Sequence, residues 1–260
     1  MKKIKMFLLI LILILLSILF IFFFVYIKGR NNAKYIAYQS SNTSDLLKYY
    51  GPSKMPFTSK AGCAMFIAIS GHNPHPQMVE AALHTGAQVN CTVGNDFTAL
   101  MDAALFNQNP QIIATLLKAG ANINAKDNLG QTALMQSTRN ETAGYQIAQE
   151  LINAGANINL VNINGQDALM YAVVFSTNPQ LVKLLIKAGS NVNATDSKGA
   201  IALMYAAKHA KNVEFIPLLI KAGANVNARN KNGQTALDYA YKYNAPQDVI
   251  DVLLKAGAVK

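Results

Sequence analysis

The sequence of 260 residues contains no tryptophan, only two cysteines and only four histidines. Two cysteines cannot define a scaffold held by several disulfides, although they can form one bridge. Paired carboxylates, a Gly-x-Ser-x-Gly motif and a phosphate-binding loop are also missing from any fitting context. We therefore predict no catalytic residue and no cofactor.

Positive charge is concentrated at the N-terminus. The formal net charge is +10, but residues 31–260 carry about +5, from 18 basic and 13 acidic residues. No run of Lys or Arg occurs beyond the N-terminal segment. Such diffuse charge indicates a soluble surface rather than a nucleic-acid site, and we expect no nucleic-acid partner and no small-molecule substrate.

One long apolar run lies at residues 6–27. As a helix it would extend about 33 Å, enough to span a bilayer core of about 30 Å. It is longer than the apolar core of a signal peptide, and it ends with bulky residues (22–26) where cleavage requires small ones. We predict an uncleaved signal-anchor helix; the alternative is a cleaved signal peptide and a soluble periplasmic protein.

The charges that flank this run are nearly balanced and give little information on topology. The N-terminus, residues 1–5, is short and rich in lysine, so we place it in the cytoplasm. The rest of the chain then lies in the periplasm of a bacterium, attached to the inner membrane by a single pass. Residues 28–43 are polar and predict a linker.

The remainder repeats with a period of 34 or 35 residues. The period is marked by Gly86, Gly120, Gly155, Gly189, Gly223 and Gly257, and by Leu100, Leu134, Leu169, Leu203 and Leu237. A period of this length with two short helical patterns per copy predicts a stacked helical array. The predicted units are a capping half-repeat at 44–60 and six repeats at 61–94, 95–128, 129–163, 164–197, 198–231 and 232–260.

The repeated residues carry a resemblance to a known family. Gly-x-Thr-Ala-Leu, an apolar helix and Leu-Leu-Lys-Ala-Gly-Ala-Asn-Ile-Asn-Ala resemble the ankyrin repeat across about residues 61–260. The resemblance implies an all-α solenoid of helix-turn-helix repeats with β-hairpin loops. The usual histidine after the leucine is replaced by methionine in several copies, so we expect an apolar contact there: Met101, Met135, Met170 and Met204.

Several local features follow within each copy. Thr98, Thr132 and Thr235 precede first helices and are suited to cap them. Leucine and isoleucine pairs of the second helices should form a continuous core. Hairpin tips that need positive φ are expected at Gly62, Gly130, Gly165, Gly199 and Gly233, and at Asp96 in the second copy.

The resemblance also places the two cysteines. In the ankyrin register Cys63 lies on the strand that leaves the first hairpin, and Cys91 begins the strand of the next. Neighbouring hairpins lie side by side in this architecture, so the resemblance implies a Cys63–Cys91 disulfide in an oxidising compartment. Two unpaired thiols, as in a cytoplasmic protein, are the alternative.

Three histidines gather near one turn of the first copy: His72, His75 and His84. They could suggest a metal site. A polar, proline-containing turn between two helices accounts for them better, and we predict no metal.

The resemblance implies a binding surface on the concave side of the first helices. An aromatic stripe follows this side through the last three copies: Tyr171, Phe175, Tyr205, His209, Tyr239 and Tyr243. Packing between neighbouring first helices is the alternative explanation of the stripe. The hairpin tips offer a second contact row: Phe97, Asp127, Asn162, Lys198 and Lys231.

These features favour a non-catalytic module of the bacterial envelope that binds a partner protein, as ankyrin proteins commonly do. An alternative is an immunity protein that neutralises a toxic effector enzyme in the periplasm. An enzyme is the contrasting class, and alanine replacement of the three clustered histidines would test it.

Overall fold

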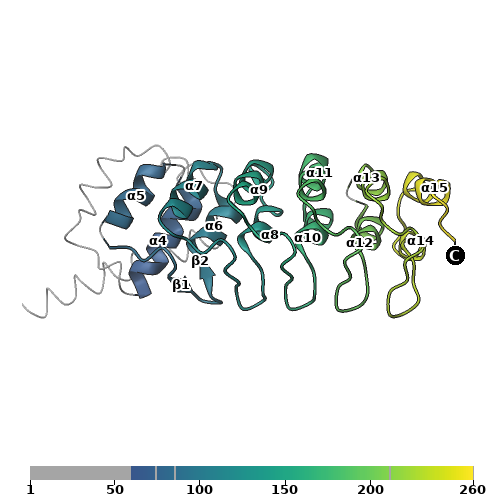
Figure 1. Ribbon diagram of the computed structural model, residues 1–260, viewed down its shortest axis with the longest axis horizontal. Helices are drawn as coiled ribbons and strands as arrows, with labels where there is room; N and C mark the ends of the chain where they lie inside the picture. The colour runs from purple at the N-terminus through teal and green to yellow at the C-terminus, as the bar shows by residue number, and fades with distance from the viewer. Residues whose placement is uncertain (1–59, 74, 85, 211, 260) are drawn as a thin grey trace, which may run out of the picture. The chain divides into compact units, whose positions relative to one another are not determined.

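The computed structural model describes residues 60–73, 75–84, 86–210 and 212–259, which lie in one compact unit of the chain. Twelve helices and one short hairpin make up this part (Figure 1). The first helices of the copies are α4 (Lys60–His72), α6 (Ala99–Phe106), α8 (Ala133–Ser137), α10 (Ala168–Phe175), α12 (Ala202–His209) and α14 (Ala236–Lys242). The second helices are α5 (Pro76–His84), α7 (Gln111–Lys118), α9 (Gly144–Asn153), α11 (Pro179–Lys187), α13 (Phe215–Lys221) and α15 (Gln247–Lys255).

The helices form two layers. Each first helix packs against the first helix of the next copy, and each second helix packs against the next second helix (Figure 1). The loops between copies project together from the layer of first helices. In the described part of the chain only one loop contains paired strands, β1 (Thr92–Val93) and β2 (Phe97–Thr98), in antiparallel register. The structure confirms the predicted helical solenoid.

Side-chain caps start most of the first helices. Thr98, Thr132 and Thr235 each accept a hydrogen bond from the backbone N–H three residues on, at 3.2–3.3 Å, as predicted. Asp167 caps α10 in the same way, at 2.8 Å. Ile201 precedes α12 without a side-chain cap. A cap of this kind fixes where the chain leaves the extended loop and enters the helix.

The predicted hairpin glycines are confirmed in four copies. Gly130, Gly165, Gly199 and Gly233 have φ between 72° and 75°, and Asp96 has φ of 59° in the second copy.

The expectation for Gly62 is wrong, because this residue lies inside α4. Ala64 stands at the position where four of the other copies place Thr or Asp and the fifth places Ile201. Helix α4 includes this position, extends upstream to Lys60 and reaches 13 residues, against eight in α6.

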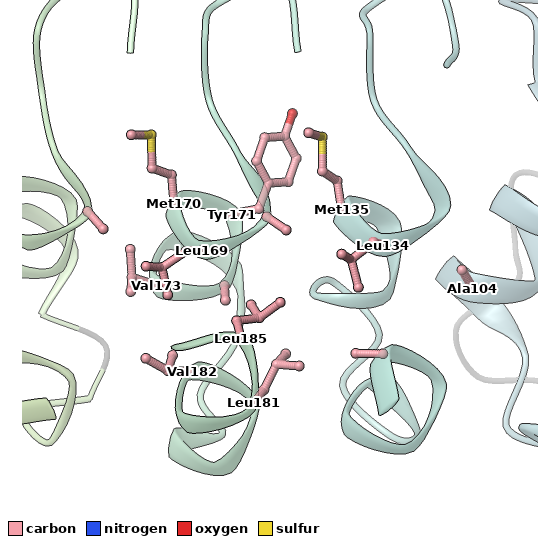
Figure 2. Close-up of a cluster of buried hydrophobic side chains, with 14 of the residues drawn as sticks. Ala104, Leu134, Met135, Leu169, Met170, Tyr171, Val173, Leu181, Val182 and Leu185 are labelled. Carbon is pink, nitrogen blue, oxygen red and sulfur yellow. The ribbon is translucent and has the colours of Figure 1, made fainter. Parts of the chain in front are cut away.

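The core runs between the two helix layers. Leu116, Leu151, Leu185, Leu219 and Leu253 are fully buried second-helix residues, and each comes from a predicted core pair. Leu254 is 46% exposed and does not belong to the core. The four methionines expected to make apolar contacts are at most 1% exposed, which confirms that expectation, and Figure 2 shows two of them.

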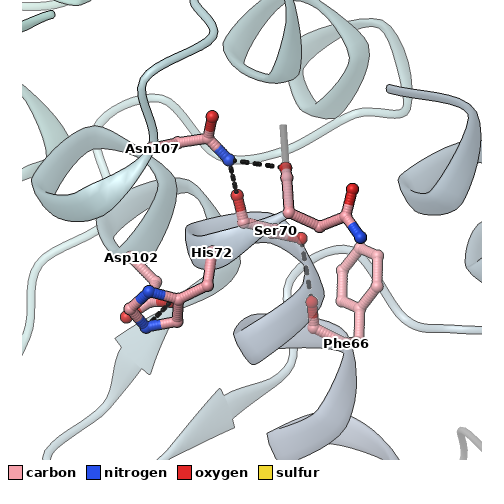
Figure 3. Close-up of polar contacts among 6 residues, drawn as sticks. Phe66, Ser70, His72, Asp102 and Asn107 are labelled. Carbon is pink, nitrogen blue, oxygen red and sulfur yellow. Dashed lines mark hydrogen bonds and ion pairs between the residues drawn. The ribbon is translucent and has the colours of Figure 1, made fainter. Parts of the chain in front are cut away.

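Asparagine side chains join neighbouring copies where the first helices end. Nδ2 of Asn107 donates to the carbonyls of Ser70 (2.7 Å) and Asn73 (2.9 Å) in the preceding copy (Figure 3). Asn140 bonds back to the carbonyl of Asn107 at 2.8 Å. Buried carbonyls at helix ends need such partners, so these amides stabilise the stacking.

The predicted anchor helix (6–27), the linker (28–43) and most of the predicted capping half-repeat (44–60) lie outside the described residues. In the ranges that are described, no helix has the length and apolar character needed to cross a bilayer.

Candidate protein-binding face

An inner row of three tyrosines fastens the hairpin loops to the first helices. The hydroxyl of Tyr171 accepts a hydrogen bond from Nδ2 of Asn162 at 3.0 Å, and Tyr239 accepts one from Asn230 at the same distance. Tyr205 donates to Oδ2 of Asp196 at 2.5 Å. Figure 2 shows Tyr171 on the side of α10 that faces the loops.

This arrangement changes the interpretation of the inner row. The sequence predicted an exposed position, but Tyr171 is 8% exposed, and Tyr205 and Tyr239 are half-buried. Burial and the bond to Asp196 raise the pKa of the Tyr205 hydroxyl, which therefore stays a donor. The three tyrosines therefore have a structural role. Their rings pack against the core, and their hydroxyls hold the hairpin loops.

An outer row of aromatic side chains lies one helical turn further on. Phe106 is 50% exposed, Phe175 is 39% exposed, Tyr243 is 43% exposed, and His209 is exposed as well. In the last three copies each outer ring lies against the inner tyrosine, with centroid separations of 5.3, 6.5 and 5.8 Å. The inner row therefore supports the outer row and fixes its orientation.

Three cations accompany the outer row and were missed in the sequence. Cζ of Arg139 lies 5.2 Å from the ring centroid of Phe175. Nζ of Lys208 and Nζ of Lys242 lie 5.0 and 5.5 Å from the ring centroid of Tyr243. The signal was present, because each cation stands five residues after a motif leucine. We call this surface the first-helix face; it consists of Phe106, Phe175, His209, Tyr243, Arg139, Lys208 and Lys242.

A histidine and an aspartate meet at the N-terminal end of this face. Nε2 of His72 lies 3.9 Å from Oδ2 of Asp102 (Figure 3). The imidazole also stacks on Phe106, with ring centroids 5.0 Å apart. Burial raises the pKa of Asp102 to about 7 and lowers the pKa of His72. The close packing of the Asp102 side chain against residue 71 requires glycine there, because a Cβ would lie 1.7 Å from Oδ2 of Asp102.

The histidines considered as a metal site are separated along the first copy. His72 ends α4, His84 ends α5, and His75 lies in the turn before α5. Nowhere in the described part of the chain do three His, Cys, Asp or Glu side chains gather closely enough to hold a metal ion.

The hairpin tips contain fewer available side chains than the sequence suggested. Asn162 is 6% exposed, and Oδ1 of Asp127 accepts hydrogen bonds from the N–H groups of Leu129 and Gln131. Phe97 is half-buried against the core. These three residues shape the loops and offer little contact area, which corrects their assignment as contact residues.

Lys198 and Lys231 are exposed, as expected. Two apolar tip residues, Leu129 and Ile163, are 47% and 65% exposed and were not singled out in the sequence. The Ile163 N–H donates to the Leu129 carbonyl at 2.9 Å, so these tips lie side by side.

A disulfide joins Cys63 to Cys91, with Cα atoms 6.0 Å apart. This is the pairing that the resemblance implied, but the bond connects different elements from those expected. Cys63 lies in α4, and Cys91 directly precedes β1. The bond therefore joins a first helix to the following hairpin, rather than two neighbouring hairpins.

A polar hollow of about 270 Å³ lies between the third and fourth copies. Glu141, Thr142 and Tyr145 line one side, and Thr177 and Gln180 line the other. The third copy creates it, because α8 ends at Ser137 after only five residues and a longer turn leads into α9.

Comparison with known families gives one result. The family model described as Ankyrin repeats (3 copies) matches three overlapping stretches of the chain, residues 64–162, 100–196 and 169–260. A search among curated proteins finds no match.

Proposed function

Because the chain belongs to the ankyrin-repeat family, we propose that it is a non-catalytic binding module that docks a partner protein on its first-helix face. Ankyrin repeats are generally protein–protein interaction modules. The observation that carries the proposal is the outer row, in which Phe106, Phe175 and Tyr243 expose 39–50% of their surface on one side of the stack. Large aromatic side chains contribute disproportionately to protein interfaces.

The outer row is also held in place before any partner binds. Phe175 lies close to both the Tyr171 ring and the guanidinium of Arg139. Tyr243 lies close to the Tyr239 ring and to the ammonium groups of Lys208 and Lys242. A side chain that is already ordered loses little entropy on binding. This support favours a docking role for these exposed rings.

The hairpin tips extend the proposed contact surface. Leu129 and Ile163 supply an apolar pair, and Lys198 and Lys231 supply charge beside it. Backbone hydrogen bonds of 2.9 Å connect successive tips, from Ile163 to Leu129 and from Lys231 to Lys198. The tips therefore form one continuous row, which suits a partner that contacts several copies at once.

We further propose that residues 6–27 anchor the protein in the inner membrane of a bacterium, with the repeats in the periplasm. The length of the apolar run supports the anchor. The Cys63–Cys91 bond supports an oxidising compartment, because disulfides are rare in the cytosol. Fractionation of cells, followed by protease treatment of spheroplasts, tests both points.

The docking proposal is tested with the full chain solubilised from native membranes. Crosslinked partners are identified and purified, and their Kd is measured for the wild type and for Phe175→Ala/Tyr243→Ala. We expect the double variant to bind at least about tenfold more weakly, as loss of interface aromatics usually does. Leu254→Ala/Val259→Ala removes exposed apolar side chains elsewhere and should leave Kd unchanged.

The result also separates the biological alternatives. A secreted toxic enzyme as the purified partner would favour an immunity role, whereas an envelope protein would favour a scaffold. Equal affinities of the wild type and of Phe175→Ala/Tyr243→Ala for every purified partner would contradict docking on the first-helix face.

A further inference from the structure

Three cations share one register on the first-helix face. Arg139, Lys208 and Lys242 each stand five residues after the motif leucine of their copy. Arg139 and Lys242 are exposed, and Lys208 is half-buried. Lys208 and Lys242 lie near the ends of α12 and α14, and Arg139 lies in the turn just after α8. The same position of each copy recurs along one side of the stack, so the three charges form a line.

Aromatic rings fix the positions of these charges. Arg139 and Lys208 each lie over a ring of a following copy, Phe175 and Tyr243. Lys242 lies over the same Tyr243 ring, 5.5 Å from its centroid. A ring beneath a cation restrains the side chain and leaves its outer side open to solvent or to a ligand.

Few acidic side chains accompany these cations, and Glu141 stands two residues after Arg139. Within α8, α10, α12 and α14 the only acidic residue is Asp238. Its Oδ2 accepts hydrogen bonds from the N–H and the hydroxyl of Thr235, at 2.8 and 3.0 Å. Among the residues that the structure describes, none of the three cations forms a salt bridge.

Two ammonium groups close to one ring concentrate positive charge there, which favours a bound anion. The pair at Tyr243 is thus complementary to a carboxylate. Arg139 adds a planar guanidinium, which suits bidentate carboxylate binding. The exposed rings between the cations suit the apolar parts of a peptide.

We propose that the first-helix face receives an extended acidic segment of the partner protein, with Asp or Glu carboxylates held by Arg139, Lys208 and Lys242. This inference rests on the proposed docking function and specifies the chemistry of the docked segment. Cations with aromatic rings also bind single-stranded nucleic acid. Three cations spread over four copies and a diffuse charge of about +5 over residues 31–260 favour the peptide.

The probe is a short fluorescein-labelled poly-glutamate peptide, titrated into the full chain in detergent micelles. Poly-glutamine and oligo-dT of equal length are tested alongside it. Arg139→Gln/Lys208→Gln/Lys242→Gln should weaken poly-glutamate binding about tenfold, because three weak exposed charge pairs are lost together. The matched control is Lys183→Gln/Lys187→Gln/Lys221→Gln, which removes the same charge from exposed positions on α11 and α13.

We expect the control to bind poly-glutamate within about twofold of the wild type, with poly-glutamine unbound and added salt weakening the complex. Three results would overturn the proposal: no binding of poly-glutamate, equal loss in the control variant, or tighter binding of oligo-dT through the same three residues.

Failure of this proposal is distinguishable from failure of the docking function. Suppose that Phe175→Ala/Tyr243→Ala weakens binding of the natural partner but the triple glutamine variant does not. The first-helix face then binds the partner, and the proposal of an acidic segment is wrong. If neither variant weakens binding of the partner, the proposed docking function is wrong as well.

Discussion

The hydroxyl of Tyr205 donates a 2.5 Å hydrogen bond to Oδ2 of Asp196, nine residues earlier in the preceding hairpin. Oδ1 of the same carboxylate accepts two backbone N–H groups of the hairpin, from Lys198 and Ala200, both at 2.8 Å. One aspartate thus closes the loop and connects it to α12. The equivalent residues in the copies on either side are asparagines, Asn162 and Asn230.

Because Tyr205 bonds to an aspartate and Tyr239 to an asparagine, removing the tyrosine hydroxyl should reduce stability by different amounts at the two positions. Tyr205→Phe should reduce the free energy of unfolding by about 1.5–3 kcal/mol, because its bond is to a charged group. Tyr239→Phe should cost about 1 kcal/mol, since its partner is neutral. Urea unfolding monitored by circular dichroism measures both.

Tyr243→Phe provides the control, because its ring is 43% exposed, and we expect a change within about 0.5 kcal/mol. Equal losses in Tyr205→Phe and Tyr243→Phe would contradict the assigned role of the inner row.

Asp102 should make stability depend on pH. Burial raises its pKa from 3.8 to about 7, so the folded state binds a proton that the unfolded state releases above about pH 4. Stability therefore falls as pH rises from about 4 to 7, and the full cost remains above 7. We expect Asp102→Asn to be more stable than the wild type by about 2–4 kcal/mol at pH 8, and about equally stable at pH 4.

Unfolding curves of both proteins across this pH range provide the measurement. Burial lowers the pKa of His72. Below the usual histidine pKa of 6.5 this makes stability rise with pH, the opposite of the effect of Asp102. His72 is present in both proteins, so their difference reports the carboxyl group together with its interaction with His72. A difference that stays constant between pH 4 and 8 would show that folding does not raise the pKa of Asp102.

The disulfide should contribute measurably to stability. Cys63 and Cys91 are 28 residues apart, and closing a loop of that size stabilises a protein by about 3.5 kcal/mol in the chain-entropy treatment. We expect Cys63→Ser/Cys91→Ser to be destabilised by about 2–4 kcal/mol. Thermal unfolding with and without reductant measures this, and the double variant should not respond to reductant. Two reactive thiols in oxidised wild-type protein would refute the bond.

Two glycines with similar backbone angles should respond differently to alanine. Gly155 has φ of 88°, and a Cβ there would meet nothing within 4 Å. Gly165 has φ of 74°, and a Cβ there would lie 2.8 Å from the backbone nitrogen of Ser197 in the next hairpin. Gly155→Ala should cost about 1 kcal/mol from backbone strain alone.

Gly165→Ala should cost more, about 2–4 kcal/mol, because the hairpins must also separate. Urea midpoints of the two variants give the comparison. Equal losses of stability in the two variants would mean that the hairpins separate at little energetic cost and contribute little to stacking.

The sequence alone predicted much of the fold because its determinants are local and repeated. A threonine cap such as Thr98, a glycine with positive φ such as Gly130, and a buried leucine such as Leu169 each act within one copy. Their recurrence at a fixed period made each identification reliable. At Gly62, which lies inside α4, the predicted hairpin tip was wrong.

The binding face depended on contacts between copies, which a period does not reveal. The inner tyrosines became structural because their hydroxyls reach loop residues nine positions earlier, and Arg139 and Lys208 became part of the face because rings of later copies lie beneath them. The sequence by itself determined the repeats, their helices and their core. The tertiary structure decided which aromatic side chains are buried and which remain exposed, because exposure depends on how closely adjacent copies pack.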